Sequence, residues 1–362
     1  MREKYDLAVF CGRFQPFHKG HREALDHAYE VAEKVLILIG SSKAASNTKN
    51  PFSFEERRAM IGEALTRDEQ FKTEFAALRD YFYSENDDLW IAEVQEVVSR
   101  FTTPNSTVVL VGRYKDETGY WLNAFPQWDR SQPPGRGDIS ATQVRDLLFS
   151  RTDSTPDWPF NPYQPESFMK AIEHPEWRTL IPDGVARWLE DNYLKKAKYA
   201  YNVIEYNQLR SYKNSWKDAP FPPTFVTVDT VVLCAGHILL VKRKFNPGKG
   251  QMALPGGFVK QEERLIDAAL RELKEETGII VGRSILKEHL DGNRVFDYPE
   301  RSLRGRTITH AFCIRLPYKE LPTIRSGSDA DQVRWVPVAD AMRIEDQYFE
   351  DHYSIIMNFL VR

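Results

Sequence analysis

The chain has 362 residues and a formal net charge of −3, with 42% hydrophobic and 28% charged residues. Domains typically contain about 100 to 200 residues, so this length predicts two domains, each large enough to bury its own core. The small net charge excludes a strong general attraction to nucleic acid or to an anionic membrane, and any phosphate binding must be local.

Targeting signals and cysteine pairs are not found in the sequence. The first residues, MREKYDLAVF, are charged, and no stretch approaches the roughly 18 consecutive apolar residues of a membrane helix. Cys11, Cys234 and Cys313 lie far apart without a CxxC pair, which favours neither a disulfide framework nor a zinc site. We therefore expect a cytoplasmic protein with no membrane and no nucleic-acid partner.

Alternating strands and helices are expected in the first third of the chain. Residues 7–12 (LAVFCG) and 35–40 (VLILIG) are apolar, strand-like runs, and residues 22–34 between them carry a helical stripe of alanine, leucine and valine. A helical segment at 87–101 and an apolar run at 106–112 continue the pattern. This order predicts an α/β fold, with a doubly wound parallel sheet of the Rossmann-like, nucleotide-binding kind.

The stretch CGRFQPFHKGH (residues 11–21) spans the end of the first strand and the start of the first helix. Free N–H groups at a helix start attract anions, and Gly20 allows the backbone to approach a ligand closely. His18 and His21 can donate hydrogen bonds to phosphate oxygens as negative charge builds up during a transfer. The stretch therefore predicts a site for the phosphates of a nucleotide.

HKGH matches the HxGH signature of the nucleotidylyltransferase superfamily. Residues 139–145 (ISATQVR) resemble a second signature of that superfamily, ISSTxxR, although an ordinary Ser/Thr helix cap is the alternative interpretation. GRFQPFHKGH together with NPFSFEERRAMI (residues 50–61) is similar to archaeal-type NMN adenylyltransferases. This resemblance implies catalytic roles for His18, His21 and Arg145. It also implies nucleotide or phosphate contacts from Gly12, Arg13, Phe14, Gly20, Arg57, Ser140 and Thr142.

One position departs from the pattern of those enzymes. In VGRYKDETGYW, Arg113 stands where the resemblance leads us to expect histidine in GHxKD, whereas Lys115 and Asp116 are kept. The contact that Arg113 makes stays open. We interpret Trp121 and Phe125 nearby as core residues rather than as a platform for a nicotinamide ring.

The composition changes between residues 150 and 222. A polar segment rich in proline is followed by a helical pattern over residues 184–210, and then by KNSWKDAPFPPTF, which has three prolines in four positions. Strand-like runs separated by a tight Ala-Gly turn follow. We expect a first domain at 1–195, a linker at 196–222 and a second domain at 223–362.

A long motif in the second domain predicts a helix with one apolar and one acidic face. In residues 256–279 (GGFVKQEERLIDAALRELKEETGI), apolar residues recur at helical spacing, and Gly278 suits the left-handed residue that ends a helix. Glu272, Glu275 and Glu276 crowd another face, and such carboxylates repel each other unless a cation neutralises them. Hard oxygen ligands select Mg²⁺ or Mn²⁺.

This segment matches every fixed position of the Nudix box, G-x5-E-x7-R-E-U-x-E-E-x-G-U. The resemblance implies an α/β/α sandwich that hydrolyses a nucleoside diphosphate linked to another moiety. It further implies that Glu272, Glu275 and Glu276 are metal ligands, that Glu275 and Glu276 are catalytic, and that Glu263 and Arg271 have supporting roles.

A polar loop downstream of the motif, PERSLRGRT, contains Arg301, Arg304 and Arg306. It is similar to the segment found in Nudix proteins that act on ADP-ribose. Arginines can grip phosphate or ribose with two hydrogen bonds, so we expect Arg304 and Arg306 to bind nucleotide. A basic turn facing solvent is the alternative for each of them.

The whole chain resembles a bifunctional bacterial family that joins an NMN adenylyltransferase to a Nudix domain. That family makes NAD and pyrophosphate from ATP and NMN, and it splits ADP-ribose into AMP and ribose 5-phosphate with Mg²⁺ or Mn²⁺. Two alternatives stay open: another acceptor, pantetheine phosphate or FMN, and a Nudix domain that senses ADP-ribose without hydrolysis. The residues do not reveal a homo-oligomer, a preferred metal, the Nudix general base or coupling between the sites.

Overall fold

The computed structural model describes residues 4–83, 87–113, 121–134, 139–150, 176–327 and 330–361. The chain divides into two compact units, Met1–Asn207 and Gln208–Arg362. Helix α9 (Ala197–Asn214) passes through this border and occupies much of the segment that we expected to be a linker. No helix among the described residues combines the length and the apolar character needed to cross a membrane.

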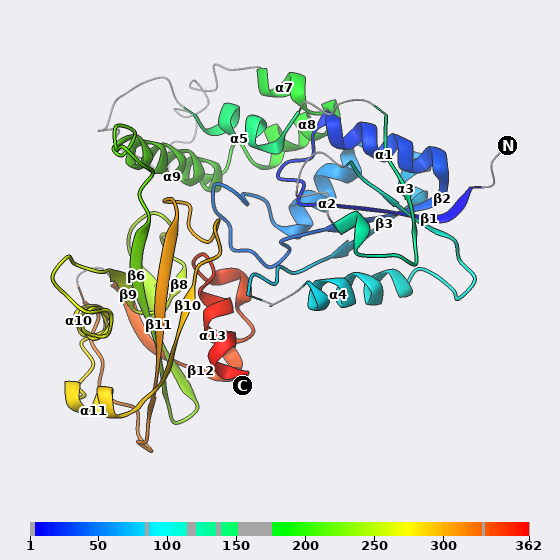
Figure 1. Cartoon of the computed structure of the whole chain (residues 1–362). Helices are drawn as coiled ribbons and strands as arrows, with labels where there is room; N and C mark the ends of the chain where they lie inside the picture. The colour runs from blue at the N-terminus through cyan, green and yellow to red at the C-terminus, as the bar shows by residue number, and fades with distance from the viewer. Residues whose placement is uncertain are drawn as a thin grey trace. The chain divides into compact units, whose positions relative to one another are not determined.

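A five-stranded, fully parallel sheet is the framework of the first unit (Figure 1). Its strand order is β3-β2-β1-β4-β5, so the direction of winding reverses between β1 and β4. The predicted doubly wound sheet is confirmed, and the crevice of such a sheet lies beyond the carboxyl ends of its central strands. The strands are β1 (Tyr5–Gly12), β2 (Ala32–Ile39), β3 (Thr73–Ala77), β4 (Val108–Val111) and β5 (Asp129–Ser131).

Helices cover both faces of this sheet because successive strand residues point to opposite sides. Ala8 and Phe10 of β1 belong to one core cluster, which also holds residues of α1, α2, α5, α7 and α8. Leu7 and Val9 belong to a second cluster with α4, and Figure 1 shows α1 and α4 on opposite sides of the strands. The helices are α1 (Lys19–Val31), α2 (Phe54–Glu63), α3 (Arg67–Lys72), α4 (Asp88–Ser99), α5 (Ala141–Phe149), α7 (Glu176–Leu180) and α8 (Asp183–Asn192).

The second unit is built on a mixed sheet with the strand order β10-β11-β6-β7-β12, to which β8 and β9 add at β7 and β6. Ala235 and Gly236 both have positive φ, 45° and 74°, and form the predicted tight turn between β6 and β7. The strands are β6 (Phe225–Cys234), β7 (His237–Arg243), β8 (Met252–Ala253), β9 (Gly256–Phe258), β10 (Leu290–Phe296), β11 (Thr307–Leu316) and β12 (Ala330–Pro337).

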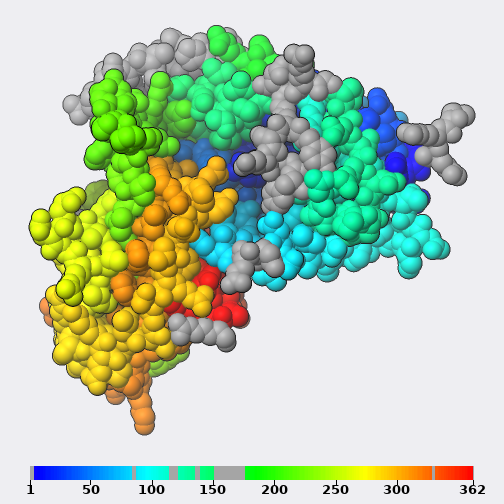
Figure 2. Space-filling view, viewed as in Figure 1, coloured from blue at the N-terminus to red at the C-terminus, as the bar shows by residue number. Residues whose placement is uncertain are grey.

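Helix α10 (Leu265–Thr277) is the helix that the second motif predicts. Its apolar face packs on β6, β7 and β11, and it ends at Gly278, whose φ of 52° is left-handed as expected. Figure 1 shows α10 and α13 on opposite sides of the strands, which confirms the predicted α/β/α sandwich. In the space-filling view the segments from α10 to β11, yellow to orange, form one continuous face of this unit (Figure 2). The remaining helices are α11 (Arg283–Glu288), α12 (Val338–Ala341), the short 3₁₀ helix η2 (Glu345–Gln347) and α13 (His352–Leu360).

Candidate active sites

The loop between β1 and α1 lies at the carboxyl edge of the parallel sheet. Gly12 accepts a backbone hydrogen bond from Gly40 at the end of β2, and a side chain at position 12 would meet the ring of Phe14 at 2.8 Å. Phe14 has a left-handed φ of 51° and is fully buried. The loop is therefore held by packing, with Phe14 inside it, and the neighbouring side chain of Arg13 is exposed.

His18 and His21 form the cap at the start of α1. Each imidazole accepts a hydrogen bond through Nδ1 from the backbone N–H of the other residue, at 3.2 and 3.3 Å. The rings are stacked with their centroids 3.6 Å apart. A neutral imidazole that accepts at Nδ1 carries its proton on Nε2, so this network assigns both residues as Nε2–H donors.

The second predicted motif meets this loop at the start of α5. Ser140 caps the helix, because its hydroxyl accepts a hydrogen bond from the N–H of Gln143. This is the ordinary helix cap that we gave as the alternative interpretation of the motif. Arg145 donates through Nη1 to the carbonyl of Gln15 at 2.7 Å and through Nη2 to Thr142 Oγ1 at 3.1 Å. Two motifs more than a hundred residues apart thus meet at one edge of the sheet.

Gly20 shows how closely the two motifs approach. A Cβ at this position would lie 3.2 Å from the ring of His18 and 3.7 Å from the carbonyl of Ile139, the residue before the Ser140 cap. The close approach that we expected at Gly20 is therefore between protein segments as well. Helix α1 and helix α5 begin side by side.

Arg57 is directed toward the backbone rather than toward the surface. Its guanidinium donates to the carbonyls of Arg13 and Gly40 at 2.7 and 2.6 Å, and to those of Ser41 and Ser53 at 3.2 and 3.1 Å. Only 1% of its surface is exposed. The structure therefore places Arg57 beneath the loop between β1 and α1, where it ties the ends of β1 and β2 together.

Positive charge is concentrated beside the loop. Burial lowers the pKa of Arg57 and of Arg145 to about 10, with the nearby charge of Arg13 adding to the shift, so both remain cationic at neutral pH. Asp80 lies in the same cluster, accepts from Ser41 Oγ at 3.0 Å, and has a pKa raised by burial. Sequence reasoning missed Asp80, which follows the unpredicted strand β3.

Arg113, which stands where the resemblance led us to expect histidine, makes contacts within the first unit. Its guanidinium donates to Glu23 of α1 and to the carbonyl of Pro134, both at 2.9 Å. Lys115, Asp116 and residues 135–138 lie outside the described residues. Phe125 is fully buried and stacked on Trp128, in agreement with the interpretation of Phe125 as a core residue.

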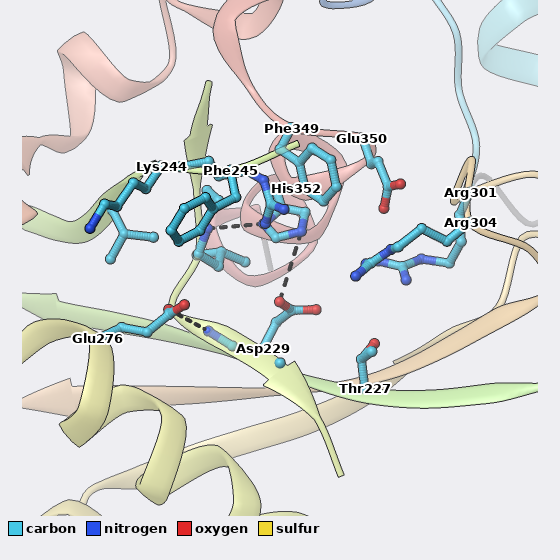
Figure 3. A pocket seen from close by; sticks show the side chains of 16 residues that line it. Thr227, Asp229, Lys244, Phe245, Glu276, Arg301, Arg304, Phe349, Glu350 and His352 are labelled. Carbon is cyan, nitrogen blue, oxygen red and sulfur yellow. Dashed lines mark hydrogen bonds and ion pairs between the residues drawn. The ribbon is translucent and has the colours of Figure 1, made fainter. Parts of the chain in front are cut away.

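The second unit contains a cavity of about 190 Å³, bordered by β6, β7, β9, α10, the loop before β11 and the start of α13. Figure 3 shows Glu276 and Asp229 on one side of this cavity and the Arg304 and Glu350 side chains on the other. The cavity therefore combines carboxylates and guanidinium groups, as a site for a metal-bound phosphate requires.

Two carboxylates of the motif face the glycines of β9. Gly256 N–H donates to Glu276 Oε2 at 3.1 Å, and a Cβ on Gly257 would lie 2.6 Å from Glu272 Oε1. The pKa of Glu276 is raised to about 8, chiefly by burial and also by the carboxylates of Glu272 and Asp229, against the opposing effects of the hydrogen bond from Gly256 and the charge of Arg243. The two glycines therefore allow a close approach between β9 and the carboxylates of α10.

Arg271 holds the remaining carboxylates of the motif. It donates to Glu263 through Nε and Nη2 at 2.9 and 2.6 Å, and through Nη1 to Glu272 at 2.7 Å and Glu275 at 3.0 Å. These hydrogen bonds lower the pKa of Glu263 to about 2. Glu275 is the most exposed of the three, at 55% of its side chain. Arg271 therefore neutralises part of an otherwise repulsive cluster.

The donor set fits a hard divalent cation in its chemistry. Glu272 and Glu276 offer carboxylate oxygens beside the β9 glycines, and such hard ligands suit this kind of cation. Within the described ranges, no three His, Cys, Asp or Glu side chains already form a metal-binding group. The side chains would have to close around an ion, and Glu275 would have to leave Arg271.

Asp229 and His352 are pocket residues that sequence reasoning did not single out. Asp229 is the one charged residue of β6, accepts from Thr309 Oγ1 at 2.6 Å, and has a pKa raised by burial. His352 accepts from the N–H of Leu254 through Nδ1 at 2.9 Å, and its Nε2 lies 3.8 Å from Asp229 Oδ1 (Figure 3). A lone carboxylate within a buried strand was a signal available in the sequence.

The three arginines of the downstream loop have different environments. Arg304 lines the cavity, with its guanidinium 4.9 Å from the ring centre of Phe258. Arg301 is buried in an ion pair with Asp351. Arg306 donates to the carbonyl of Asp297 and is not among the residues that line the cavity. Of the two arginines expected to bind nucleotide, the structure brings Arg304 to the cavity and leaves Arg306 outside it.

Family comparisons assign each unit to a class. The cytidylyltransferase-like family matches residues 9–147, and the NUDIX domain family matches residues 223–359. Together with the parallel sheet, the histidine-capped helix and the acidic α10, these matches define a nucleotidylyltransferase joined to a Nudix hydrolase.

Individual relatives match one unit each. The nicotinamide/nicotinic acid mononucleotide adenylyltransferase of Acinetobacter baylyi is 35% identical over 147 residues, which cover 40% of this chain and 77% of the relative. The ADP-ribose pyrophosphatase of Methanocaldococcus jannaschii is 32% identical over 164 residues, which cover 45% of this chain and 85% of the relative.

A solved structure of a bifunctional protein matches both units of this chain. A bifunctional NMN adenylyltransferase/ADP ribose pyrophosphatase from Francisella tularensis, complexed with AMP and a Mn ion, has a TM-score of 0.83 and 35% identity, covering 98% of each chain. This chain belongs to that family of bifunctional NMN adenylyltransferase/ADP-ribose pyrophosphatases.

Proposed function

We propose that the first unit transfers the adenylyl group of ATP to NMN, and that the second hydrolyses ADP-ribose to AMP and ribose 5-phosphate. The observation that carries the proposal is that each unit brings the separate parts of its own motif to one place. The start of α1 meets the start of α5, and the glycines of β9 meet Glu272 and Glu276 of α10. Similarity to the bifunctional Francisella protein over nearly the full chain supports both activities.

In the first unit, an oxygen of the NMN phosphate attacks the α-phosphorus of ATP, a new P–O bond forms, and pyrophosphate leaves. The negative charge of the transition state would be stabilised by the Nε2–H groups of His18 and His21 and by the guanidinium of Arg145. Arg13 and the start of α5 at Ser140 and Thr142 would hold phosphate oxygens. Arg57 would act through the loop that it supports.

In the second unit, water attacks a phosphorus of the diphosphate and a bridging P–O bond breaks. A divalent cation, Mg²⁺ or Mn²⁺, would polarise the diphosphate when held by Glu272, Glu275 and Glu276. Arg304 faces the cavity as a cation for the diphosphate. Glu350, a cavity carboxylate outside the motif whose pKa burial raises, is our candidate for accepting the proton of water.

The test measures both activities on one preparation. We expect NAD from ATP and NMN, and AMP from ADP-ribose only with Mg²⁺ or Mn²⁺ present. We also expect Glu276→Gln to lower AMP release by about 1000-fold, or about 4 kcal/mol in the barrier, because it removes a negative ligand from the cation. NAD formation in the same variant should be unchanged.

Two results would redirect the proposal. Product formation with pantetheine phosphate or FMN but not NMN would replace the acceptor. Tight ADP-ribose binding without AMP release would make the second unit a sensor, although three crowded carboxylates favour hydrolysis. We also propose a cytoplasmic location, since the substrates ATP, NMN and ADP-ribose are phosphorylated metabolites.

A further inference from the structure

Three consecutive residues at the start of α13 contact three different walls of the Nudix cavity. Glu350 accepts from Ser302 Oγ at 2.7 Å and from the N–H of Leu303 at 3.2 Å. Asp351 pairs with Arg301. His352 accepts from Leu254 N–H, between β8 and β9, and faces Asp229 of β6 (Figure 3). The segment therefore joins walls that are far apart in the sequence.

The Arg301–Asp351 ion pair is the most buried of these contacts. Nε donates to Oδ2 at 2.8 Å and Nη2 to Oδ1 at 2.7 Å, and the two side chains are 2% and 3% exposed. A buried pair contributes little net stability relative to well-packed apolar residues, because both charges lose their hydration. A bidentate pair, however, fixes the relative orientation of the two segments that carry it.

Both segments carry a cavity group directly beside the pair. Arg304 lies three residues beyond Arg301, and Glu350 directly precedes Asp351. Arg304 and Glu350 both line the cavity. Glu350 also has a left-handed φ of 46°, which a residue with a side chain adopts only where its surroundings impose it. The hydrogen bonds from Ser302 and Leu303 and the neighbouring ion pair supply that constraint.

We infer that the Arg301–Asp351 pair, assisted by the Ser302–Glu350 hydrogen bond, is a positioning device that holds Arg304 and Glu350 across the cavity for diphosphate hydrolysis. The inference rests on the proposed function of the second unit. Arg301 and Asp351 act through their neighbours and do not touch the reacting atoms. Loss of the pair releases the loop of residues 301–306 from the start of α13, so that the cavity groups no longer face one substrate together.

The experiment compares Asp351→Asn and Arg301→Lys with the parent chain. Asn keeps the shape of Asp but loses its charge, and Lys keeps the charge of Arg but loses the two-pronged geometry. Steady-state AMP release from ADP-ribose gives kcat and KM, and NAD formation by the same chain reports intact protein. Phe359→Leu, also on α13 but packed against Phe296, is the matched control for lost packing alone.

We expect Asp351→Asn to lower kcat by at least 30-fold, and Arg301→Lys by about tenfold, at temperatures where both variants remain folded. Phe359→Leu should keep kcat within twofold of the parent even though it lowers the unfolding midpoint. Ser302→Ala leaves the buried pair intact, so it should fold and lower kcat by about fivefold. Ser302→Ala therefore still tests the inference if Asp351→Asn and Arg301→Lys fail to fold.

Amide hydrogen exchange provides a readout that does not depend on the substrate. Exchange in peptides covering residues 301–306 and 349–352 should accelerate in Asp351→Asn and stay unchanged in Phe359→Leu. If the parent releases no AMP, the proposed function fails, and the exchange data still test the positioning. Unchanged exchange in both segments, or kcat within twofold of the parent in folded Asp351→Asn and Ser302→Ala, would overturn the inference.

Discussion

The two active sites differ in the charge that they present to a phosphorylated substrate. The site of the first unit is made of donors: two Nε2–H groups, the start of α1, and the cations Arg13 and Arg145. The site of the second unit gathers carboxylates, and Arg271 neutralises only part of their charge. On the proposed function, the first site would attract a phosphate through its own donors, whereas the carboxylates of the second would need a cation between them and the diphosphate.

This difference shows that phosphate chemistry can rest on backbone geometry or on side-chain charge. In the first unit, Arg57 and the histidine cap fix the backbone of the loop between β1 and α1. In the second unit, the glycines of β9 bring the backbone against carboxylates of α10. Substitutions should therefore act through backbone order in one site and through carboxylate placement in the other.

Among substitutions that should affect one activity and leave the other unchanged, we expect the largest effect from His21→Asn. The amide oxygen can still accept the capping hydrogen bond from His18, but the shorter side chain no longer presents the Nε2–H donor. Loss of one such donor typically slows a transfer by about 100- to 1000-fold. The rate of NAD formation should fall by this amount while AMP release is unaffected. An equal fall in both activities would contradict two independent sites.

The next effect concerns backbone support by Arg57. Arg57→Met removes the donors of several buried carbonyls, and we expect the free energy of unfolding of the first unit to fall by about 3 kcal/mol. Denaturant unfolding followed by tryptophan fluorescence measures the change. Arg58→Met on the same helix is the control, because its side chain is 57% exposed and should change stability by about 0.5 kcal/mol or less. If Arg57→Met lowered the free energy of unfolding by less than about 1 kcal/mol, Arg57 would not be a major support of the backbone.

Carboxylate placement is tested by Gly257→Ala. The new methyl group would lie 2.6 Å from Glu272 Oε1, so this flexible carboxylate must move while the backbone stays in place. We expect AMP release to fall about tenfold, or about 1.4 kcal/mol in the barrier, with unchanged folding. Gly282→Ala is the control, since the nearest atoms there are 3.9 Å away. Equal activity of the two variants would count against a close approach of Glu272 to β9.

The last effect is a pH dependence and concerns His352, which burial keeps neutral. Burial lowers the pKa of His352 to about 3, and it is faced by Asp229, Asp351, Arg243, Arg301 and Arg304. An unfolded chain binds a proton here below about pH 6.5, whereas the folded chain does so only near pH 3. Its stabilising contribution is therefore complete above pH 6.5 and is lost as the pH falls below that value.

The measurement compares unfolding free energies of the parent and His352→Gln between pH 7 and pH 5. The parent should lose up to about 1.4 kcal/mol more per pH unit than the variant, because only the parent gains a titrating imidazole on unfolding. Parallel pH profiles would show that His352 does not titrate differently in the folded and unfolded chains.

The fold and the acidic helix could be predicted from the sequence because their signals are local. The alternation of strand-like and helical patterns predicted the parallel sheet. The spacing of the second motif predicted α10, its apolar face and the left-handed Gly278. The short strands β3 and β5 escaped prediction. Thr73–Ala77 and Asp129–Ser131 carry too few apolar residues to mark a buried strand by themselves.

The contacts that support the sites could not be predicted because they join distant segments. Arg57 carries the same charge whether it meets a phosphate or a carbonyl, and only the order of β1 and β2 brings the carbonyls of Arg13 and Gly40 to it. Arg301 and Asp351 are 50 residues apart and share no pattern. Arg304 and Arg306 are near neighbours in the sequence, but Arg304 lines the cavity whereas Arg306 lies beside Asp297.

The mutual capping of His18 and His21 has a consequence for how substitutions at the two positions combine. Each ring accepts a main-chain N–H of the other residue at Nδ1, so the two side chains and the first turn of α1 hold one another in place. Because each residue supports the other, the loss of NAD formation in a double variant should be smaller than the sum of the two single losses, expressed as free energies.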